Sequence, residues 1–488
     1  MKYTHILAGI MAVCFALAPI AAEQENSDLP GDIQSAIAGC NANVPTNAQT
    51  GMPVPFAGVV SLTPGSLPLT DSMVGSLYVA PATGAGGYLQ GSPGSEPCRS
   101  TRESQFTHIL THNLLVMEEE VSQGTWYQLR TYQPTLPTVS FNHISPVYPV
   151  EMITWYEAVL FANLLSVERG YNRCYYTNSS KTTPIDSSNY NNNNTIYFDY
   201  TADGFRLPTE GEWEYFARAG TTSAFWANEP MYTSASCSWC LPGYMANLDG
   251  VAWWCANSGN KTNVVGMIGP NPWNLKDVHG NVDEWCWDWA GAYPKGVVTD
   301  YSGPASGAYR IARGGNCTSY AKDCRSASEG YSWPYARHPT NGFRLVRSLS
   351  IHWNWDFGDG SLPSAQSNPT HAYTNPGNYT WTMTADVLGQ LCVKTGQITV
   401  GGTGSGPTIT NITSKTSKAG SSATIYGTGF STDKKKDVVY FGTKKVKSIN
   451  KAKTTCLKVT IPKVAKGAYA VTVLVNGVTS NAFTFTVK

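Results

Sequence analysis

The chain has 488 residues, enough for about three domains of ordinary size. Its formal net charge of +1 gives the chain as a whole no electrostatic attraction to nucleic acid. Only 14% of the residues are charged, while Gly, Tyr and Trp are plentiful, a mixture that suits loop-rich extracellular domains better than helical cytosolic enzymes.

Residues 1–22 have the pattern of a secretory signal peptide. Lys2 and His5 precede an apolar run over 6–20, and small residues at 21–22 offer a cleavage site. The run is too short to span a membrane comfortably, and no later segment is apolar enough to do so. We therefore expect a secreted, periplasmic or cell-surface protein without a transmembrane segment after cleavage. A membrane anchor and a lipoprotein attached at Cys14 are the alternatives.

The twelve cysteines fit export to an oxidising compartment, where most of them should pair. Cleavage would remove Cys14 and leave an odd number, so at least one thiol should stay free or pair with another chain. Cys240 and Cys255 flank a loop that a disulfide between them would close. Cys237 and Cys240 form a Cys-x-x-Cys motif. The sequence has no second such motif and no histidine pair nearby, so it does not predict a zinc site.

The residue pattern after the signal peptide predicts different kinds of structure in successive parts of the chain. Residues 23–84 are low in charge and rich in Pro, Gly, Ala and Thr, and we expect an extended leader with at most a short helix near Asp32–Ala38. Apolar residues at helical spacing predict a helix over 154–165. Acidic residues in the first turn support a second helix over 209–219. Beyond residue 348 short alternating segments predict β-sandwich modules.

Seven short motifs occur in the order typical of one family. They are YLQGSP at 88–93, EVSQG at 120–124, YPVE at 148–151, FRLPTEGEWEY at 205–215, HGNVDEW at 279–285, ARGG at 312–315 and GFRLV at 342–346. Residues 85–348 therefore resemble the formylglycine-generating-enzyme, or sulfatase-modifying-factor, family. The resemblance implies a mixed α+β fold related to C-type lectins, with many long loops.

The resemblance implies a calcium site at residues 277–284. Family members hold calcium at the corresponding segment through side chains and backbone carbonyls. Carried over, the ligands are the carboxylates of Asp277 and Glu284 and the carbonyls of Gly280 and Val282. Calcium takes six to eight oxygens in flexible geometry, and a glycine-containing turn with two carboxylates supplies several. The alternative is a capped turn without metal.

The resemblance also raises the question of catalysis. Enzymes of the family oxidise a substrate cysteine with two cysteines that bind copper(I), an ion that soft thiolates select. The candidates here are Cys317 and Cys324, but Cys317 comes only two residues after Gly315, a register similar to that of the non-catalytic branch. Three interpretations stay open for this pair: a disulfide with each other or with another cysteine, free structural thiols, or a displaced copper pair.

Two further patterns are mainly structural. The charged and aromatic residues of 205–215 predict a buried ion-pair network that orders loops. Trp285, Trp287 and Trp289 alternate and should share one face of a strand. Core packing is the expected role of these tryptophans, and a carbohydrate-stacking face is the alternative.

Two modules follow the central domain. Residues 349–401, with DFGDG at 356–360, resemble the PKD-type module, although its first strands are either missing or supplied by 344–352. Residues 407–488 resemble the immunoglobulin-like IPT/TIG module. This last module is rich in lysine, and Asp433 and Asp437 are its only acids. The lysines form either a solvated face or a surface for an anionic glycan or the cell envelope.

The sequence thus predicts an exported α+β protein with C-terminal β-sandwich modules. We expect it to bind a protein or glycan ligand at the cell surface and not to bind nucleic acid. The rival prediction is a copper-dependent oxidase that makes formylglycine on exported sulfatases. The cysteine register after Gly315 favours binding.

Overall fold

The computed structural model describes residues 37–44, 47–66, 69–191, 195–227, 240, 246–388, 390–401, 406–475 and 478–488. The predicted signal peptide lies outside these residues, as does most of the short helix predicted near Asp32–Ala38. The chain divides into two compact units. One contains Leu62–Ser350, and the other contains Gly39–Ser61 together with Ile351–Lys488.

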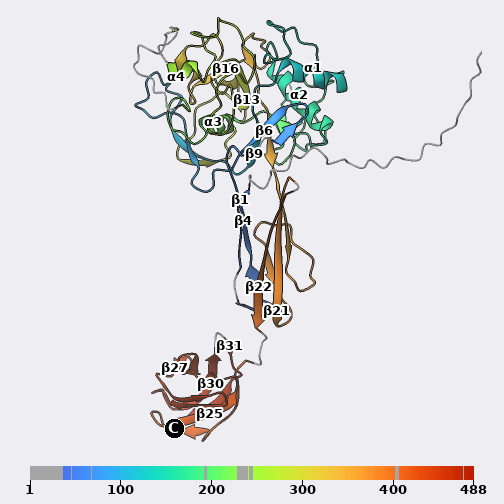
Figure 1. Ribbon diagram of the computed structural model, residues 1–488. Helices are drawn as coiled ribbons and strands as arrows, with labels where there is room; N and C mark the ends of the chain where they lie inside the picture. Colours follow the sequence, from blue (N-terminus) through green and yellow to red (C-terminus); the bar gives the residue numbers. More distant parts are fainter. Residues whose placement is uncertain are drawn as a thin grey trace, which may run out of the picture. The chain divides into compact units, whose positions relative to one another are not determined.

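Sheets of three, four and five strands form the frame of the first unit (Figure 1). The five-stranded sheet has the order β12 (Phe205–Arg206), β18 (Val346–Leu349), β9 (Asn113–Met117), β6 (Gly75–Ala80) and β5 (Leu69–Asp71). The four-stranded sheet has the order β16 (Glu329–Ser332), β15 (Arg310–Arg313), β13 (Asp283–Trp289) and β17 (Asn341–Gly342). The three-stranded sheet joins β14 (Val297–Thr299), β8 (Phe106–Ile109) and β7 (Tyr88–Gln90), and β10 (Tyr175–Tyr176) pairs with β11 (Tyr197–Phe198).

Both predicted helices are confirmed, and each begins with a capping box. Helix α2 (Trp155–Glu168) is capped by Thr154, and helix α3 (Glu210–Arg218) by Thr209. In each case the threonine accepts from the backbone N–H three residues on, while a glutamate at that position accepts from the threonine N–H. Helix α1 (Gln123–Tyr132), capped by Ser122, was not predicted. The short α4 (Ala246–Asp249) and a 3-10 turn (Ala321–Cys324) complete the helices of the described residues.

The second unit contains the PKD-like module, and its strands come from two distant parts of the chain. One sheet has the order β19 (Ile351–Asp356), β21 (Gly377–Val387), β22 (Gln390–Gly401) and β2 (Asn47–Gln49). Separately, β20 (Thr370–Ala372) pairs with β3 (Pro53–Pro55), and β1 (Ile37–Asn43) pairs with β4 (Ala57–Leu62). A disulfide joins Cys40 to Cys392.

The structure differs here from the extended leader expected over 23–84. Residues 37–80 supply six strands, of which β5 and β6 belong to the first unit and β2 and β3 complete the PKD-like module. Val54 and Phe56 are buried with Trp355, Phe357 and Trp381 in one core, so the low-charge segment gains apolar burial only when the distant strands are present. The first strands of this module therefore come from the N-terminal segment and from β19.

The IPT/TIG-like module forms two packed sheets. One has the order β23 (Thr408–Ile412), β25 (Ser422–Thr428), β29 (Cys456–Thr460) and β28 (Ile449–Lys453). The other joins β24 (Thr416–Ser417), β32 (Phe483–Val487), β30 (Gly467–Val475), β26 (Asp437–Phe441) and β27 (Lys444–Lys445), with β31 (Val478–Thr479) beside β30. Inward residues from both sheets, including Ile425, Phe441, Leu457 and Phe485, form its own core. The predicted class, mixed α+β with strand-rich C-terminal modules, is confirmed.

No helix among the described residues has the length and apolar character needed to cross a membrane.

Candidate functional site

Buried ion pairs order the centre of the first unit, as the motif at 205–215 predicts. Arg206 makes two hydrogen bonds to Glu212, at 2.7 and 2.8 Å, in a fully buried pair. Glu214 of α3 accepts from Arg218 and, across the sheet, from Arg313. Because isolated buried charges are costly, the pair with Arg313 holds α3 against β15 and the pair with Arg206 holds α3 against β12.

The predicted calcium segment is a tight turn before β13. Asp277, Gly280 and Asn281 all have φ between +57° and +84°. A Cβ on Gly280 would lie 2.0 Å from the Trp253 carbonyl oxygen, so only glycine fits there. The turn brings Asp277 and Glu284 into one buried region with Glu120, a residue not predicted as part of the site.

The two predicted carboxylate ligands have different partners. Glu284 accepts from Arg344 Nη2 at 2.8 Å and from Trp213 Nε1 at 2.7 Å, so both of its oxygens are engaged by protein donors. Asp277 Oδ2 accepts from the Gly266 N–H, whereas its Oδ1 is buried without a partner. Asp277 thus fits a cation ligand, while Glu284 is held by an arginine.

Glu120 adds a third carboxylate to this region. It accepts from Asn281 Nδ2 at 2.7 Å and from the Val282 N–H at 3.1 Å. Burial, reinforced by the Asp277 and Glu284 carboxylates, raises the pKa of Glu120 well above its usual range. Within the described residues, however, no three acidic, histidine or cysteine side chains converge as a metal-binding group. The calcium site therefore stays a prediction.

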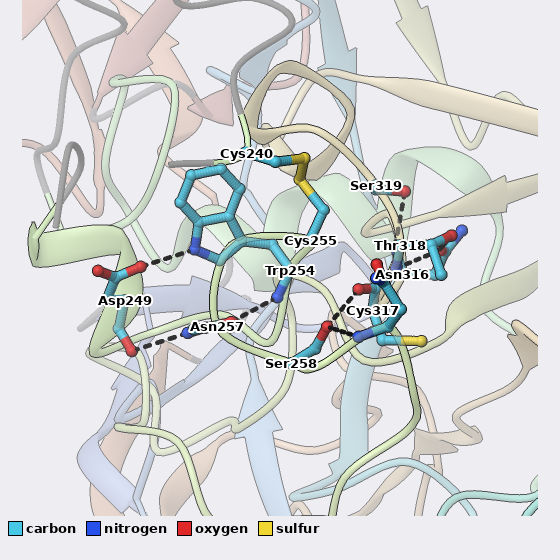
Figure 2. Close-up of a disulfide and its surroundings, with 11 residues drawn as sticks. Cys240, Asp249, Trp254, Cys255, Asn257, Ser258, Asn316, Cys317, Thr318 and Ser319 are labelled. Carbon is cyan, nitrogen blue, oxygen red and sulfur yellow. Dashed lines mark hydrogen bonds between the residues drawn. A yellow bond between two sulfur atoms is a disulfide. The ribbon is translucent and has the colours of Figure 1, made fainter. Parts of the chain in front are cut away.

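Figure 2 shows the predicted disulfide between Cys240 and Cys255, which is confirmed. It lies close to the segment 316–319, because the Cys255 N–H donates to the Ser319 carbonyl at 3.0 Å. In that segment the Cys317 N–H donates to the Asn281 carbonyl at 2.9 Å, and Ser258 Oγ donates to the Cys317 carbonyl. The backbone of Cys317 is thus fixed against the turn that precedes β13.

Cys317 and Cys324 do not form the expected disulfide; both are free thiols. The other free cysteines among the described residues are Cys174, Cys286 and Cys456, whereas Cys40, Cys98, Cys240, Cys255 and Cys392 are disulfide-bonded. Cys324 is fully buried in an apolar cluster with Ala224, Phe225 and Leu248. Both side chains are buried as free thiols, Cys324 in this cluster, which agrees with the second of the three interpretations, free structural thiols.

The same environment does not fit an open copper(I) site. Burial raises the pKa of Cys317 to about 12 and that of Cys324 well above its usual range, so both thiols keep their protons at neutral pH. Copper(I) is bound by thiolates, and a substrate thiolate needs access to the metal. Neither condition is met, because the side chains of both cysteines are almost wholly buried.

The alternating tryptophans do lie on one strand, β13. Trp285 is fully buried, and Trp287 stacks on Tyr175 at a centroid distance of 5.4 Å. The guanidinium of Arg310 lies 3.6 Å from the ring centroid of Trp289 and 3.8 Å from that of Trp155. This face therefore packs against protein, as the core-packing interpretation expects.

A groove of about 260 Å³ lies against the four-stranded sheet that contains β13. It is lined by Asp283, Ala312, Gly330, Tyr331, Ser332, His338, Thr340 and Asn341. Ala312 and Gly330 face each other across β15 and β16, and Asp283 faces Asn341 across β13 and β17. Because Ala312 has a small side chain and Gly330 has none, they leave room for the groove. Most of the other residues that line it have polar side chains. Burial raises the pKa of Asp283 to about 7.

Tyr331, which lines this groove, belongs to a group of exposed aromatic rings on β16 and the segment that follows it. Tyr331, Trp333 and Tyr335 are 51%, 42% and 58% exposed. Trp333 stacks on Tyr335 with centroids 5.6 Å apart and packs on Tyr309 at 4.4 Å. We call these four residues, Tyr309, Tyr331, Trp333 and Tyr335, the aromatic rim. The sequence analysis missed them, although the alternation Tyr331-x-Trp333-x-Tyr335 was a usable signal.

The fold and the ordered motifs define a sulfatase-modifying-factor type of domain. The family model described as Sulfatase-modifying factor enzyme 1-like domain matches residues 101–349, and the chain belongs to this family. A PKD domain model matches residues 347–400, and an IPT/TIG domain model matches residues 407–487.

Among relatives, the Chaperone protein LppX of Paenibacillus barcinonensis is 31% identical over 269 residues, which are 51% of this chain and 85% of LppX. The Formylglycine-generating enzyme of Streptomyces coelicolor is 33% identical over 154 residues, 30% of this chain, and the match spans only 48% of that enzyme. The solved structure of Treponema denticola variable protein 1 is 28% identical, with a TM-score of 0.45, and covers 63% of this chain and 98% of its own.

Proposed function

We propose that this protein is a non-catalytic binding protein outside the cell, and that its ligand is a neutral glycan held in the groove beside the aromatic rim. The observation that carries the proposal is a group of exposed aromatic rings on and after the edge strand β16, one of which, Tyr331, lines a polar groove. Grouped exposed aromatic residues rimmed by polar ones mark binding surfaces rather than ordinary surface.

The chemistry of the groove matches a sugar. A sugar ring presents C–H groups on its faces and hydroxyl groups around its edge, so it can stack on an aromatic ring and still exchange hydrogen bonds with polar side chains. Trp333 and Tyr335 offer ring faces, while Asp283, Ser332 and Asn341 offer acceptors and donors. The volume is slightly below the roughly 300–1,000 Å³ of drug-sized ligand sites, so it suits one or two sugar rings.

Two observations argue against the oxidase alternative. The candidate cysteines are buried, protonated thiols, whereas nucleophilic and metal-binding cysteines must reach the thiolate form. LppX, of which the match spans 85%, is named a chaperone, and the match to the Streptomyces coelicolor enzyme spans under half of that enzyme.

A disulfide between Cys240 and Cys255 and another between Cys40 and Cys392 support export to an oxidising compartment.

Affinity electrophoresis of the full chain through gels containing dextran, pullulan, arabinoxylan or mixed-linkage β-glucan tests this proposal. We expect at least one polysaccharide to retard the protein, and Trp333→Ala to weaken that binding about tenfold, equivalent to about 1.4 kcal/mol. Tyr132→Ala is the matched control, because Tyr132 is 57% exposed on α1, outside the aromatic rim. Absence of retardation by every neutral polysaccharide, or equal effects of Trp333→Ala and Tyr132→Ala, would overturn the assignment.

The oxidase alternative has its own test. Incubation of the reduced protein with copper(I), oxygen and a sulfatase-type cysteine peptide should leave the peptide mass unchanged. Conversion of the peptide cysteine to an aldehyde, lost in both Cys317→Ser and Cys324→Ser, would establish the enzyme and refute a purely binding role.

We also keep calcium as a structural proposal for the turn before β13. The unpartnered oxygen of Asp277 and the carbonyls of Gly280 and Val282 would hold it, and a dication would offset the excess of buried carboxylates over the single Arg344. Glu284 would join only by giving up part of its contact with Arg344.

A further inference from the structure

The IPT/TIG-like module has a large positive net charge, whereas the rest of the protein has a negative one. Residues 407–488 contain fourteen lysines, no arginine and two aspartates, a net charge of +12. Residues 1–406 therefore carry a net charge of −11. The overall balance of +1 thus hides a strongly basic module at the end of the chain.

The two acids of this module do not neutralise its lysines. Asp437 is buried, and its Oδ1 accepts from the Ser431 N–H at 2.9 Å. Asp433 accepts from the Lys435 N–H at 3.0 Å. Across residues 406–475 and 478–488, the structure gives no lysine an ion pair with a carboxylate. The lysine charges are therefore left to solvent or to a ligand.

Three of the exposed lysines share the outer face of one sheet. Lys451 of β28 lies directly opposite Lys458 of β29, and Lys453 follows two residues along β28. The residue between them, Ala452, faces Leu457 on the core side. We call Lys451, Lys453 and Lys458 the lysine face.

Like charges directly opposite each other on paired strands are destabilising. Lysine on an edge strand commonly prevents unwanted strand pairing, and this accounts for Lys451 and Lys453 because β28 is an edge strand. It does not account for Lys458, because β29 lies between β25 and β28. A bound anion would relieve the repulsion between Lys451 and Lys458.

We propose that the lysine face binds an anionic polysaccharide outside the cell. Neighbouring strands are about 4.8 Å apart and alternate residues of one strand about 7 Å apart, so the face presents a flat grid of point charges to a linear polymer. The module has no arginine, the side chain suited to bidentate phosphate contacts, so attraction to spaced carboxylates or sulfates fits better than phosphate recognition. The disulfides point to an oxidising compartment, which disfavours nucleic acid as the partner.

The test uses the full chain and heparin as the probe. Binding is measured by calorimetry and by elution from immobilised heparin at several salt concentrations. We expect the triple variant Lys451→Gln, Lys453→Gln, Lys458→Gln to lose about tenfold in affinity at about 0.1 M salt and to depend less steeply on salt, since exposed charges are screened over about 10 Å.

The matched control removes three lysines near the other sheet, Lys415→Gln, Lys418→Gln, Lys488→Gln. These residues flank β24 and β32, so the control has the same change in charge at a different place. We expect the control to lose less than about threefold, and the lysine-face variant to melt no lower than the parent because a like-charge pair has been removed.

Equal losses in the two variants would mean diffuse attraction without a site and would refute the lysine face. Tighter binding of duplex DNA than of heparin, or an affinity independent of salt, would also overturn the proposal. The groove of the first unit takes no part in this experiment, so its outcome is independent of the neutral-glycan proposal.

Discussion

At the scale of single residues, the buried charges of the first unit serve structure first. Glu284 illustrates this, because its carboxylate joins Arg344, Trp213 and the start of β13 in a wholly buried contact. Removal of one partner from a buried pair leaves the other charge uncompensated, which typically costs 3–5 kcal/mol. Asp277, only seven residues earlier, instead keeps one buried oxygen without a donor.

Although the sequence predicts both residues as calcium ligands, this difference in partners predicts different effects for substitutions of Glu284 and Asp277. Glu284→Gln should destabilise the protein by about 3 kcal/mol with or without calcium, because it leaves Arg344 unpaired. Asp277→Asn should cost less and should abolish any calcium-dependent rise in melting temperature, because a ligand that binds only the native state stabilises it. Scanning calorimetry in calcium and in chelator measures both effects. An unchanged melting temperature of the parent protein in chelator would remove calcium from the description.

His108 gives a prediction for acid. Its Nδ1 bonds Gln90 Oε1 at 2.7 Å, and its Nε2 accepts from the Tyr301 N–H at 2.9 Å, so the neutral ring is fully satisfied. Burial lowers the pKa of His108 to about 4, although Glu212 and Asp300 oppose the shift. The unfolded chain therefore binds this proton more readily, and stability should fall by about 3 kcal/mol as the pH drops from about 6.5 to 4.

Urea unfolding between pH 8 and pH 4 measures this loss. A His108→Gln variant should be less stable at pH 8 and should show a smaller decline towards pH 4, because the titrating ring is gone. Parallel curves for the variant and the parent protein would show that other groups control the acid response.

At the scale of elements, the strands of the PKD-like module depend on a disulfide and on a second segment of chain. Cys40 of β1 bonds Cys392 of β22, and Phe56 beside β4 packs on Phe357 at a centroid distance of 5.0 Å. A link between residues 352 apart strongly restricts the unfolded chain. We therefore expect Cys40→Ser with Cys392→Ser to destabilise the second unit by about 2–5 kcal/mol.

Scanning calorimetry can assign this effect to one unit. The transition lowered by the double substitution should be the one that Phe56→Ala lowers, because both changes act on the same core. Removal of the other bridge, by Cys240→Ser with Cys255→Ser, should lower the transition of the first unit instead. A double Cys40 and Cys392 variant that melts like the parent would show that the strands hold without the disulfide.

At the scale of the whole molecule, the two proposed ligands fall on different units and use different chemistry. The groove beside the aromatic rim belongs to the first unit and offers ring faces and polar groups. The lysine face belongs to the second unit and offers charge alone. A protein with both could hold a neutral glycan and an anionic polymer at once.

The sequence by itself determined the features that depend on neighbours along the chain. Helices α2 and α3 follow from apolar spacing and from caps three residues away, and the Cys240–Cys255 bridge closes a local loop. The module order followed from ordered motifs, and the basic composition of the last module could be counted. These signals are local because helix caps, turns and alternating strands are specified within a few residues.

Only the tertiary structure decided which distant residues meet. The expected leader forms strands β1 to β6, Glu284 pairs with Arg344, and Cys317 and Cys324 are buried free thiols that do not pair with each other. The tertiary structure also built the groove from four strands that the chain visits in a different order. The physical reason is that partners far apart in sequence are selected by burial and packing, which depend on the whole core and leave no signature in any one segment.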